Sequence, residues 1–277
     1  MSSLKSTELL AFLVCPLCKR DLAEFGSKLK CTYCAREYGI RNGIPLLYPD
    51  TIDFEHLREE ENLAKMMKNL SFSKKDQTSL IQWEKSKQEF WDMVQGNIGQ
   101  PPKAFINIGC GYDNSFSILE KNGYMFINFD IVYDMLYDLQ TQHGSKFCVA
   151  GDINYLPFRK HSFDYVVSID VIHHEYDKAE ALLRSFHELL KPGGILFLED
   201  PNAWGMFQFI KSAFLPRPLY RSLRSWYHKL KNPHKKPADY EYALSIWAAR
   251  RMLKDLSFTN ITAYSNNAYP EWLLHKN

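Results

Sequence analysis

Four cysteines near the N-terminus have the spacing of a metal site. Cys15 and Cys18 form one C-x2-C pair, and Cys31 and Cys34 form a second pair after twelve intervening residues. Each pair brings two sulfur atoms to one tight turn, and four thiolates suit tetrahedral Zn²⁺. Because four sulfur ligands leave no open position for a substrate, we expect a structural zinc that a module with so small a core needs in order to fold.

A glycine-rich turn later in the chain has the features of a nucleoside site. Gly109 and Gly111 follow an apolar run, so the backbone there can approach a ligand closely. Asp130 ends the next apolar run, where a carboxylate can accept both hydroxyls of a ribose. A dinucleotide site would have a third glycine at Asn114, and its pyrophosphate would meet the charge of Asp113. S-adenosylmethionine has no phosphate and carries a sulfonium, so the pattern favours this cofactor.

Two adjacent histidines, His173 and His174, are the candidates for acid–base chemistry. Both follow a later apolar run, and the carboxyl ends of strands are where ligands bind in α/β sheets. Histidine titrates near neutral pH, so one of the two is expected to act as general base if a methyl group is transferred to a hydroxyl. The alternative is that one of the two caps or packs the helix that follows.

The elements that must position these residues fall into three segments. Residues 1–50 contain the cysteine pairs and turn-rich strands, and residues 51–102 change to a composition that predicts one or two amphipathic helices as a linker or cap, with a break near residues 71–73. From residue 103 to residue 277, apolar runs alternate with helical segments, which predicts an α/β fold with a mostly parallel, doubly wound sheet. The expected strands are Ala104–Ile108, Met125–Phe129, Phe147–Val149, Tyr165–Ile169 and Ile195–Leu198, and two closing strands are expected at 258–264 and 269–274.

The residues around the cysteines also show a resemblance to a known family. The turns Cys15-Pro-Leu-Cys18 and Cys31-Thr-Tyr-Cys34, with the run Tyr38-Gly-Ile-Arg-Asn-Gly-Ile-Pro45 after them, make residues 10–50 similar to the small zinc-ribbon proteins that activate tRNA and release-factor methyltransferases. The resemblance implies a ribbon that docks on a methyltransferase and covers apolar surface, here within one chain.

A second resemblance covers about residues 103–200. Segments 106–111, 129–136, 150–158, 162–168, 171–174 and 188–194 are similar, in order, to the motifs of class I S-adenosylmethionine-dependent methyltransferases. The resemblance implies a Rossmann-like, seven-stranded sheet with the methionine part of the cofactor at the glycine turn, the ribose at the acid after the second strand, and the adenine after the third. The residues carried over for cofactor binding are Asn107, Gly109, Gly111, Asp130, Ile131, Asp152, Ile153 and Ser168. Two departures are Asn107 in place of the usual acid and Asp113 in place of a later glycine.

A basic insertion at about residues 203–238 interrupts the last part of the chain. Between Asp200 and Asp239 there is no acidic residue, and the segment contains eight Lys or Arg residues. A helix over 218–231 would have one apolar face and one basic face. It could be a lid, a surface for an anionic acceptor or RNA, or a helix on a membrane surface.

The composition excludes several other classes of protein. The chain has 277 residues, of which 45% are hydrophobic and 24% charged, with a net charge of +2. Those values predict a globular chain rather than a disordered one, and with no apolar run near membrane-spanning length we expect a cytoplasmic protein. The sequence therefore predicts methyl transfer from S-adenosylmethionine to a small or carrier-linked acceptor. The alternatives are an RNA methyltransferase, which would use the ribbon and the basic insertion, and a non-catalytic binding subunit.

Overall fold

The computed structural model describes residues 7–69, 87–200 and 245–263. Within these residues the chain forms two compact units. The first contains the described residues up to Val167, Glu188–Phe197 and residues 262–263, and the second contains Ser168–His187 and the described residues from Leu198 to Ile261.

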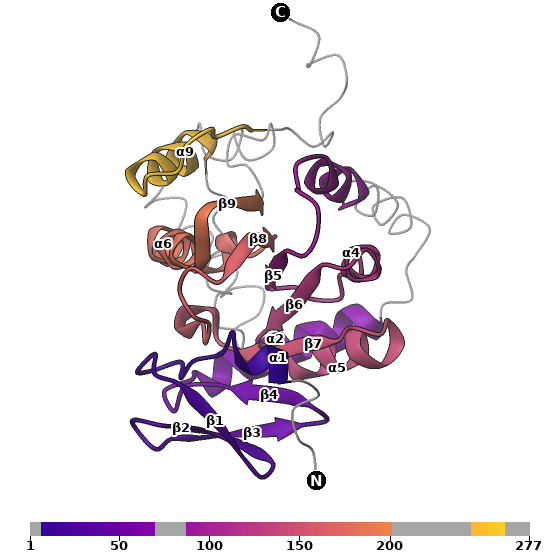
Figure 1. Cartoon of the computed structure of the whole chain (residues 1–277), viewed down its shortest axis with the longest axis vertical. Helices are drawn as coiled ribbons and strands as arrows, with labels where there is room; N and C mark the ends of the chain where they lie inside the picture. The colour runs from indigo at the N-terminus through magenta and orange to yellow at the C-terminus, as the bar shows by residue number, and fades with distance from the viewer. Residues whose placement is uncertain (1–6, 70–86, 201–244, 264–277) are drawn as a thin grey trace, which may run out of the picture. The chain divides into compact units, whose positions relative to one another are not determined.

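The N-terminal residues form a small antiparallel sheet, seen in indigo and violet in Figure 1. The Asn42-Gly43 dipeptide joins its last two strands, with φ values of 51° and 80° that suit a tight hairpin turn. Alternate residues along the strands are buried, among them Leu29, Tyr38 and Ile40. The elements are α1 (Thr7–Leu10), β1 (Leu22–Phe25), β2 (Lys28–Cys31), β3 (Glu37–Arg41) and β4 (Ile44–Leu47). Residues 7–50 are called the ribbon below.

Five further strands complete the sheet. β5, β6 and β7 pair in parallel, and every residue of β5 and β7 is buried, as expected for strands covered on both faces. The strands are β5 (Ala104–Ile108), β6 (Met125–Asp130), β7 (Phe147–Gly151), β8 (Phe163–Ile169) and β9 (Leu190–Glu199), and the α-helices after them are α4 (Phe116–Lys121), α5 (Tyr133–Gln142), α6 (Ala179–Leu189) and α9 (Ile246–Asp255). Short 3₁₀ segments follow β7 at Ile153–Tyr155 and β8 at Ile172–Lys178.

The sheet has nine strands among the described residues, and the prediction of seven was wrong. Its order is β1-β2-β3-β4-β7-β6-β5-β8-β9. The difference arises because β4 pairs in parallel with β7, with Leu46 opposite Ala150 and Leu47 opposite Gly151, so the ribbon strands extend the central sheet. Of the two expected closing strands, residues 258–263 form no strand, and residues 264–277 lie outside the described residues. The mostly parallel α/β architecture itself is confirmed.

The linker contains the helices that its composition predicted. α2 spans Phe54–Asn69, and a second helix covers 87–96, whereas the expected break near residues 71–73 lies outside the described residues. The basic insertion at 203–238 also lies outside them. In the part of the chain that the structure describes, no helix combines the length and the apolar character needed to cross a membrane.

Candidate functional site

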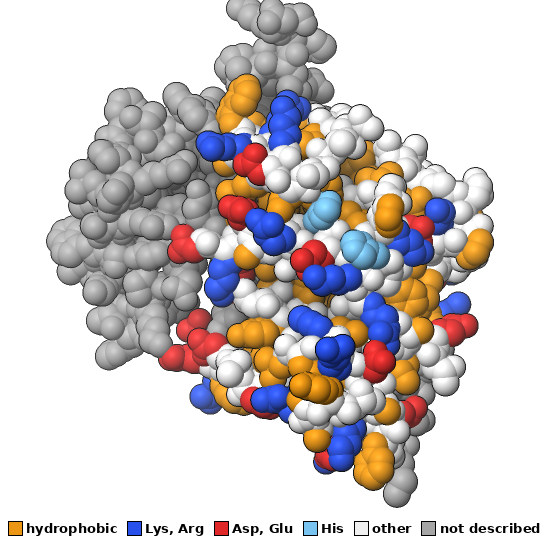
Figure 2. Space-filling view, turned by 60° about the vertical axis from the view of Figure 1, so that its left-hand side comes forward, with side chains coloured by type: hydrophobic (Ala, Val, Ile, Leu, Met, Phe, Trp, Pro, Cys, Tyr) orange, Lys and Arg blue, Asp and Glu red, His pale blue; other side chains and the backbone are white. Residues whose placement is uncertain are grey.

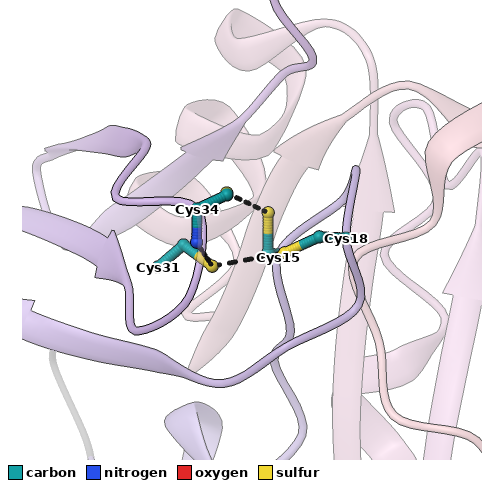
Figure 3. Close-up of side chains that lie close together, drawn as sticks. All are labelled: Cys15, Cys18, Cys31 and Cys34. Atoms are coloured by element: carbon teal, nitrogen blue, oxygen red, sulfur yellow. Dashed lines mark hydrogen bonds between the residues drawn. The ribbon is translucent and has the colours of Figure 1, made fainter.

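The four predicted zinc ligands converge on one point (Figure 3). Their sulfur atoms all lie within 4.8 Å of one another, with 3.7 Å between Cys15 and Cys34 and 3.4 Å between Cys18 and Cys31. Zn–S bonds of about 2.3 Å in a tetrahedron place sulfur atoms about 3.8 Å apart. The four thiolates therefore suit one structural zinc ion, as the cysteine spacing predicted.

The two cysteine turns share one backbone design. The N–H of Cys15 donates to the carbonyl of Arg20, and the N–H of Cys31 donates to the carbonyl of Arg36, both at 2.8 Å. In each turn the residue after the second cysteine has a left-handed φ, 58° in one and 59° in the other. Each turn is closed by hydrogen bonds between residues that are close in the sequence. Its tight geometry could therefore be predicted from the C-x2-C spacing.

Backbone hydrogen bonds join the ribbon to the central sheet beyond the β4–β7 pair. The N–H of Val14 donates to the carbonyl of Pro157, and the N–H of Arg159 donates to the carbonyl of Phe12, both at 2.9 Å. Leu13 lies between these bonds and forms an antiparallel bridge with Phe158. The ribbon is thus held along a segment that follows the carboxyl end of β7.

Two ribbon side chains also reach loops at the carboxyl edge of the sheet. The hydroxyl of Tyr48 donates to the carbonyl of Ile131 at 2.8 Å, and the ammonium of Lys19 donates to the carbonyl of Leu156 at 3.0 Å. Burial raises the pKa of Tyr48, and the charge of Asp130 raises it further. The hydroxyl therefore stays protonated and can act as the hydrogen-bond donor. The ribbon therefore supports the loops that follow β6 and β7.

Gly109 and Gly111 form a turn at the carboxyl end of β5, beside Asp130 at the end of β6. Their φ values of 69° and 52° lie in the left-handed region that favours glycine. The N–H of Gly111 donates to Oδ2 of Asp130 and the N–H of Val132 donates to Oδ1, each at 2.8 Å. A Cβ added at Gly111 would meet no atom of the described residues within 4 Å, so none of these residues fills the space beside the turn.

Asp130 is buried but keeps acceptor capacity for a ligand. The side chain belongs to a residue that is 7% exposed, and burial raises its pKa to about 6 although the backbone N–H groups of Val132 and Gly111 lower it in part. An ionised carboxylate has about four acceptor positions. The N–H groups of Gly111 and Val132 use two of them, and a backbone hydrogen bond from Ile131 also reaches the carboxylate, which leaves about one or two positions for hydroxyls such as those of a ribose.

Asp152 and Ile153 follow the carboxyl end of the next strand, β7. Oδ1 of Asp152 accepts from the backbone N–H and from the side-chain amide of Asn154, at 2.8 Å and 3.0 Å, which caps the 3₁₀ turn. Parallel strands end at one edge, so the structure brings Gly109, Asp130 and Asp152 to the same edge of the sheet. That edge is where ligands bind in open α/β sheets.

Two of the predicted cofactor residues are buried polar groups with no hydrogen-bond partner among the described residues. Asn107 is 1% exposed, and neither its amide oxygen nor its amide nitrogen is paired within the described residues. Ser168, in the second unit, is fully buried, and its hydroxyl is likewise unpaired in the described part of the chain. Such groups cost free energy unless a ligand or a water molecule meets them. Asn107 therefore fits a residue that faces a polar ligand such as the amino-acid part of S-adenosylmethionine.

The carboxylate of Asp113, which departs from the family pattern, is used within the protein. Its Oδ2 accepts from the indole Nε1–H of Trp91 at 3.0 Å, and its Oδ1 accepts from the N–H of Ser115 at 3.0 Å. Trp91 lies in the helix over 87–96, so the linker is bonded directly to the glycine turn. Trp91 was not among the residues predicted from the sequence, because nothing local indicates a partner 22 residues away.

Helix α2 also packs on the loops of the cofactor edge. Ala64 forms a buried cluster with Val132 and Met135, and Tyr112 and Ile131 pack against this cluster. Of these residues, Tyr112 directly follows Gly111 in the sequence and Ile131 directly follows Asp130. The helical linker therefore contacts the predicted cofactor loops through both of its described helices.

In the second unit, the two predicted histidines have different environments. The side chain of His173 is 11% exposed, and its Nδ1 lies 2.6 Å from Oδ1 of Asp200, whose side chain is 8% exposed. His174 is exposed, and its ring centroid lies 4.1 Å from that of His173. Asp200 follows β9, the strand beside β8, and its pairing with His173 was not predicted from the sequence. The sequence feature that could have indicated this contact is that Asp200 comes shortly after the apolar run of β9.

Two family models match the chain. Residues 6–43 match the model described as a Trm112p-like protein, and residues 106–198 match the model described as a methyltransferase domain. The two matched segments contain the four cysteines and the glycine turn, respectively.

Known proteins match part of the chain. Phosphoethanolamine N-methyltransferase 1 of Zea mays is 31% identical over 106 residues, which cover 36% of this chain and 21% of that protein. Probable tRNA methyltransferase 9B of Mus musculus is 27% identical over 166 residues, which cover 54% and 34%. The chain thus spans about a fifth to a third of the length of these relatives. Among solved structures, the cyclopropane synthase MmaA2 of Mycobacterium tuberculosis aligns with a TM-score of 0.45 at 17% identity, covering 61% of this chain and 59% of that one.

Proposed function

We propose that this chain, a methyltransferase domain joined behind a Trm112p-like segment, transfers a methyl group from S-adenosylmethionine to a small or carrier-linked acceptor. The family matches identify the two segments. The observation that supports the cofactor most directly is the buried carboxylate of Asp130, which is bonded to the glycine turn and retains acceptor positions. We further propose a cytoplasmic location, because four free thiolates for zinc suit a reducing compartment.

Each part of the cofactor has a proposed set of residues. Bound S-adenosylmethionine supplies a methyl group on a positively charged sulfur. The amide of Asn107 and the turn at Gly109 and Gly111 would hold its methionine part, and Asp130 would accept hydrogen bonds from the ribose. The remaining proposed cofactor residues are Ile131 beside the ribose, Asp152 and Ile153 beside the adenine, and Ser168 next to the cofactor.

The proposed chemistry needs few groups from the protein. Alignment of the acceptor with the methyl group supplies most of the acceleration in such a transfer. An acceptor with an O–H or N–H group must also lose a proton, for which His173 or His174 is the proposed general base. The two histidines follow β8, at the strand end where ligands bind in sheets of this type.

RNA is the second candidate for the acceptor. It is favoured by the Trm112p-like match and by the relative named as a tRNA methyltransferase. On the face shown in Figure 2, the described Lys and Arg side chains lie interspersed with Asp and Glu. An RNA surface would therefore depend on the basic insertion at 203–238, which is also the segment on which the membrane-surface hypothesis rests.

Two measurements test this proposal. Calorimetric titration with S-adenosylhomocysteine tests the cofactor site. Asp130→Ala should weaken binding by about 1–3 kcal/mol, because it leaves hydroxyl groups of the ligand without a hydrogen-bond acceptor. Transfer of a tritiated methyl group to phosphoethanolamine or to total tRNA then distinguishes the two acceptor classes. Label in tRNA alone, abolished by neutralising Arg221, Arg224 and Lys231, would favour the RNA candidate. Failure of the wild-type chain to bind S-adenosylhomocysteine would favour a non-catalytic subunit.

A further inference from the structure

The carboxylate of Asp200 contacts both the imidazole ring of His173 and the backbone N–H groups of residues 172 and 173. Oδ1 of Asp200 lies 2.6 Å from Nδ1 of His173, and Oδ2 accepts the N–H of Ile172 at 2.9 Å. A longer bond of 3.3 Å joins the N–H of His173 to Oδ1. One carboxylate therefore fixes both the start of the 3₁₀ segment Ile172–Lys178 and the orientation of the ring. All of these residues belong to the second compact unit.

The bond to Nδ1 determines which ring nitrogen carries the proton. An ionised carboxylate only accepts hydrogen bonds, so Nδ1 of His173 is the donor and, in the neutral ring, Nε2 has the lone pair. The side chains of His173 and Asp200 are 11% and 8% exposed, so water competes little for this short, charge-assisted bond. Nε2 is the nitrogen that a proton-accepting role would require.

We infer that Asp200 is the positioning residue of His173, and that His173 rather than His174 accepts the proton of the methyl acceptor. This inference rests on the proposed function. As a lone pair on the oxygen or nitrogen of the acceptor forms the bond to the methyl carbon, the electron pair of the carbon–sulfur bond returns to sulfur. The proton of the acceptor moves to Nε2 of His173, and the resulting imidazolium keeps its Nδ1–H bond to Asp200, whose negative charge stabilises it.

The inference restricts the chemical class of the acceptor. A proton-accepting histidine serves an acceptor with an O–H or N–H group that must be deprotonated during transfer. An acceptor without such a proton, for example a thioether or a tertiary amine, would gain nothing from the pair. The arrangement therefore favours hydroxyl and primary or secondary amine acceptors.

Nitrogen-15 NMR on the histidine rings of the full chain tests the pair without any acceptor. In the wild-type chain the neutral ring of His173, assigned with His173→Gln, should carry its proton on Nδ1. In Asp200→Asn the side chain has only one acceptor oxygen, and its amide nitrogen donates instead of accepting. The amide N–H can then donate to Nδ1 of His173, so the ring proton should move to Nε2. Glu180→Gln removes an exposed carboxylate from α6 and should leave the tautomer unchanged. A wild-type ring protonated on Nε2, or an unchanged tautomer in Asp200→Asn, would overturn the inference.

Kinetics separate a positioning role from a purely structural cap. With an acceptor that the transfer assay identifies, Asp200→Asn should lower kcat about 100-fold while KM and the affinity for S-adenosylhomocysteine stay unchanged. An unchanged kcat would leave Asp200 as a cap of the 3₁₀ segment only. Failure of the proposed function is distinguishable, because it appears as absent S-adenosylhomocysteine binding in the wild-type chain, whereas the tautomer is measured with no ligand present.

Discussion

The raised pKa of Asp130 predicts that cofactor binding weakens on the acid side of neutrality. The ribose hydroxyls would donate to the ionised carboxylate, and a pKa of about 6 leaves about a tenth of the molecules ionised at pH 5. An apparent dissociation constant varies inversely with the fraction of competent molecules. Affinity for S-adenosylhomocysteine should therefore be about tenfold weaker at pH 5 than at pH 8, a difference of about 1.4 kcal/mol. The loss occurs as the pH falls through the pKa of Asp130, because protonation removes acceptor positions.

Calorimetric titrations at pH 5, 6, 7 and 8 measure this effect. Asp130→Asn keeps the size of the side chain but cannot ionise, so it should bind more weakly at pH 8 and show no change of affinity with pH. Asp134→Asn removes an exposed acid from α5 and is the matched control, expected to keep the wild-type dependence. Equal wild-type affinity at pH 5 and pH 8, or the same slope in Asp130→Asn, would refute the assignment of the ribose to this carboxylate.

Three further predictions concern the framework around the site. Metal analysis of chain purified without chelators should find about one zinc per molecule, and Cys31→Ser should lower both the zinc content and the thermal midpoint. Trp91→Phe removes the donor to the buried carboxylate of Asp113 and should cost about 1–3 kcal/mol in denaturant unfolding, whereas an unchanged midpoint would mean that the bond is not needed. Gly151→Ala places a Cβ 2.9 Å from the ring of Phe129 and should destabilise the chain by about 1–3 kcal/mol, which the same unfolding measurement checks against wild type.

The features that the sequence predicted correctly depend on neighbouring residues. The cysteine turns are closed by bonds that span five residues, such as Cys15 N–H to the carbonyl of Arg20, so the spacing alone indicates them. The central strands are short apolar runs with a helical segment between them, and β5 and β7 are buried along their whole length. Such runs are recognisable without knowledge of which strands pair.

The features that the sequence did not predict depend on contacts between distant residues. The pairing of β4 with β7 uses backbone groups, so the residue types of Leu46 and Ala150 do not indicate that they lie opposite each other. The predicted number of strands was wrong for this reason. The hydrogen bond between Asp113 and Trp91 was not predicted, because Trp91 comes from a helix elsewhere in the chain. The role of Asp200 likewise depends on the neighbouring strand order of β8 and β9, which no local pattern specifies.

Covalent fusion changes the energetics of the β4–β7 junction. When two pairing surfaces share one polypeptide, association becomes a concentration-independent step with an effective concentration in about the millimolar range or above. Both segments are then made in equal amounts. Occupation of Ala150 and Gly151 by β4 also closes that border of the sheet to strands from other molecules, which removes one route to aggregation.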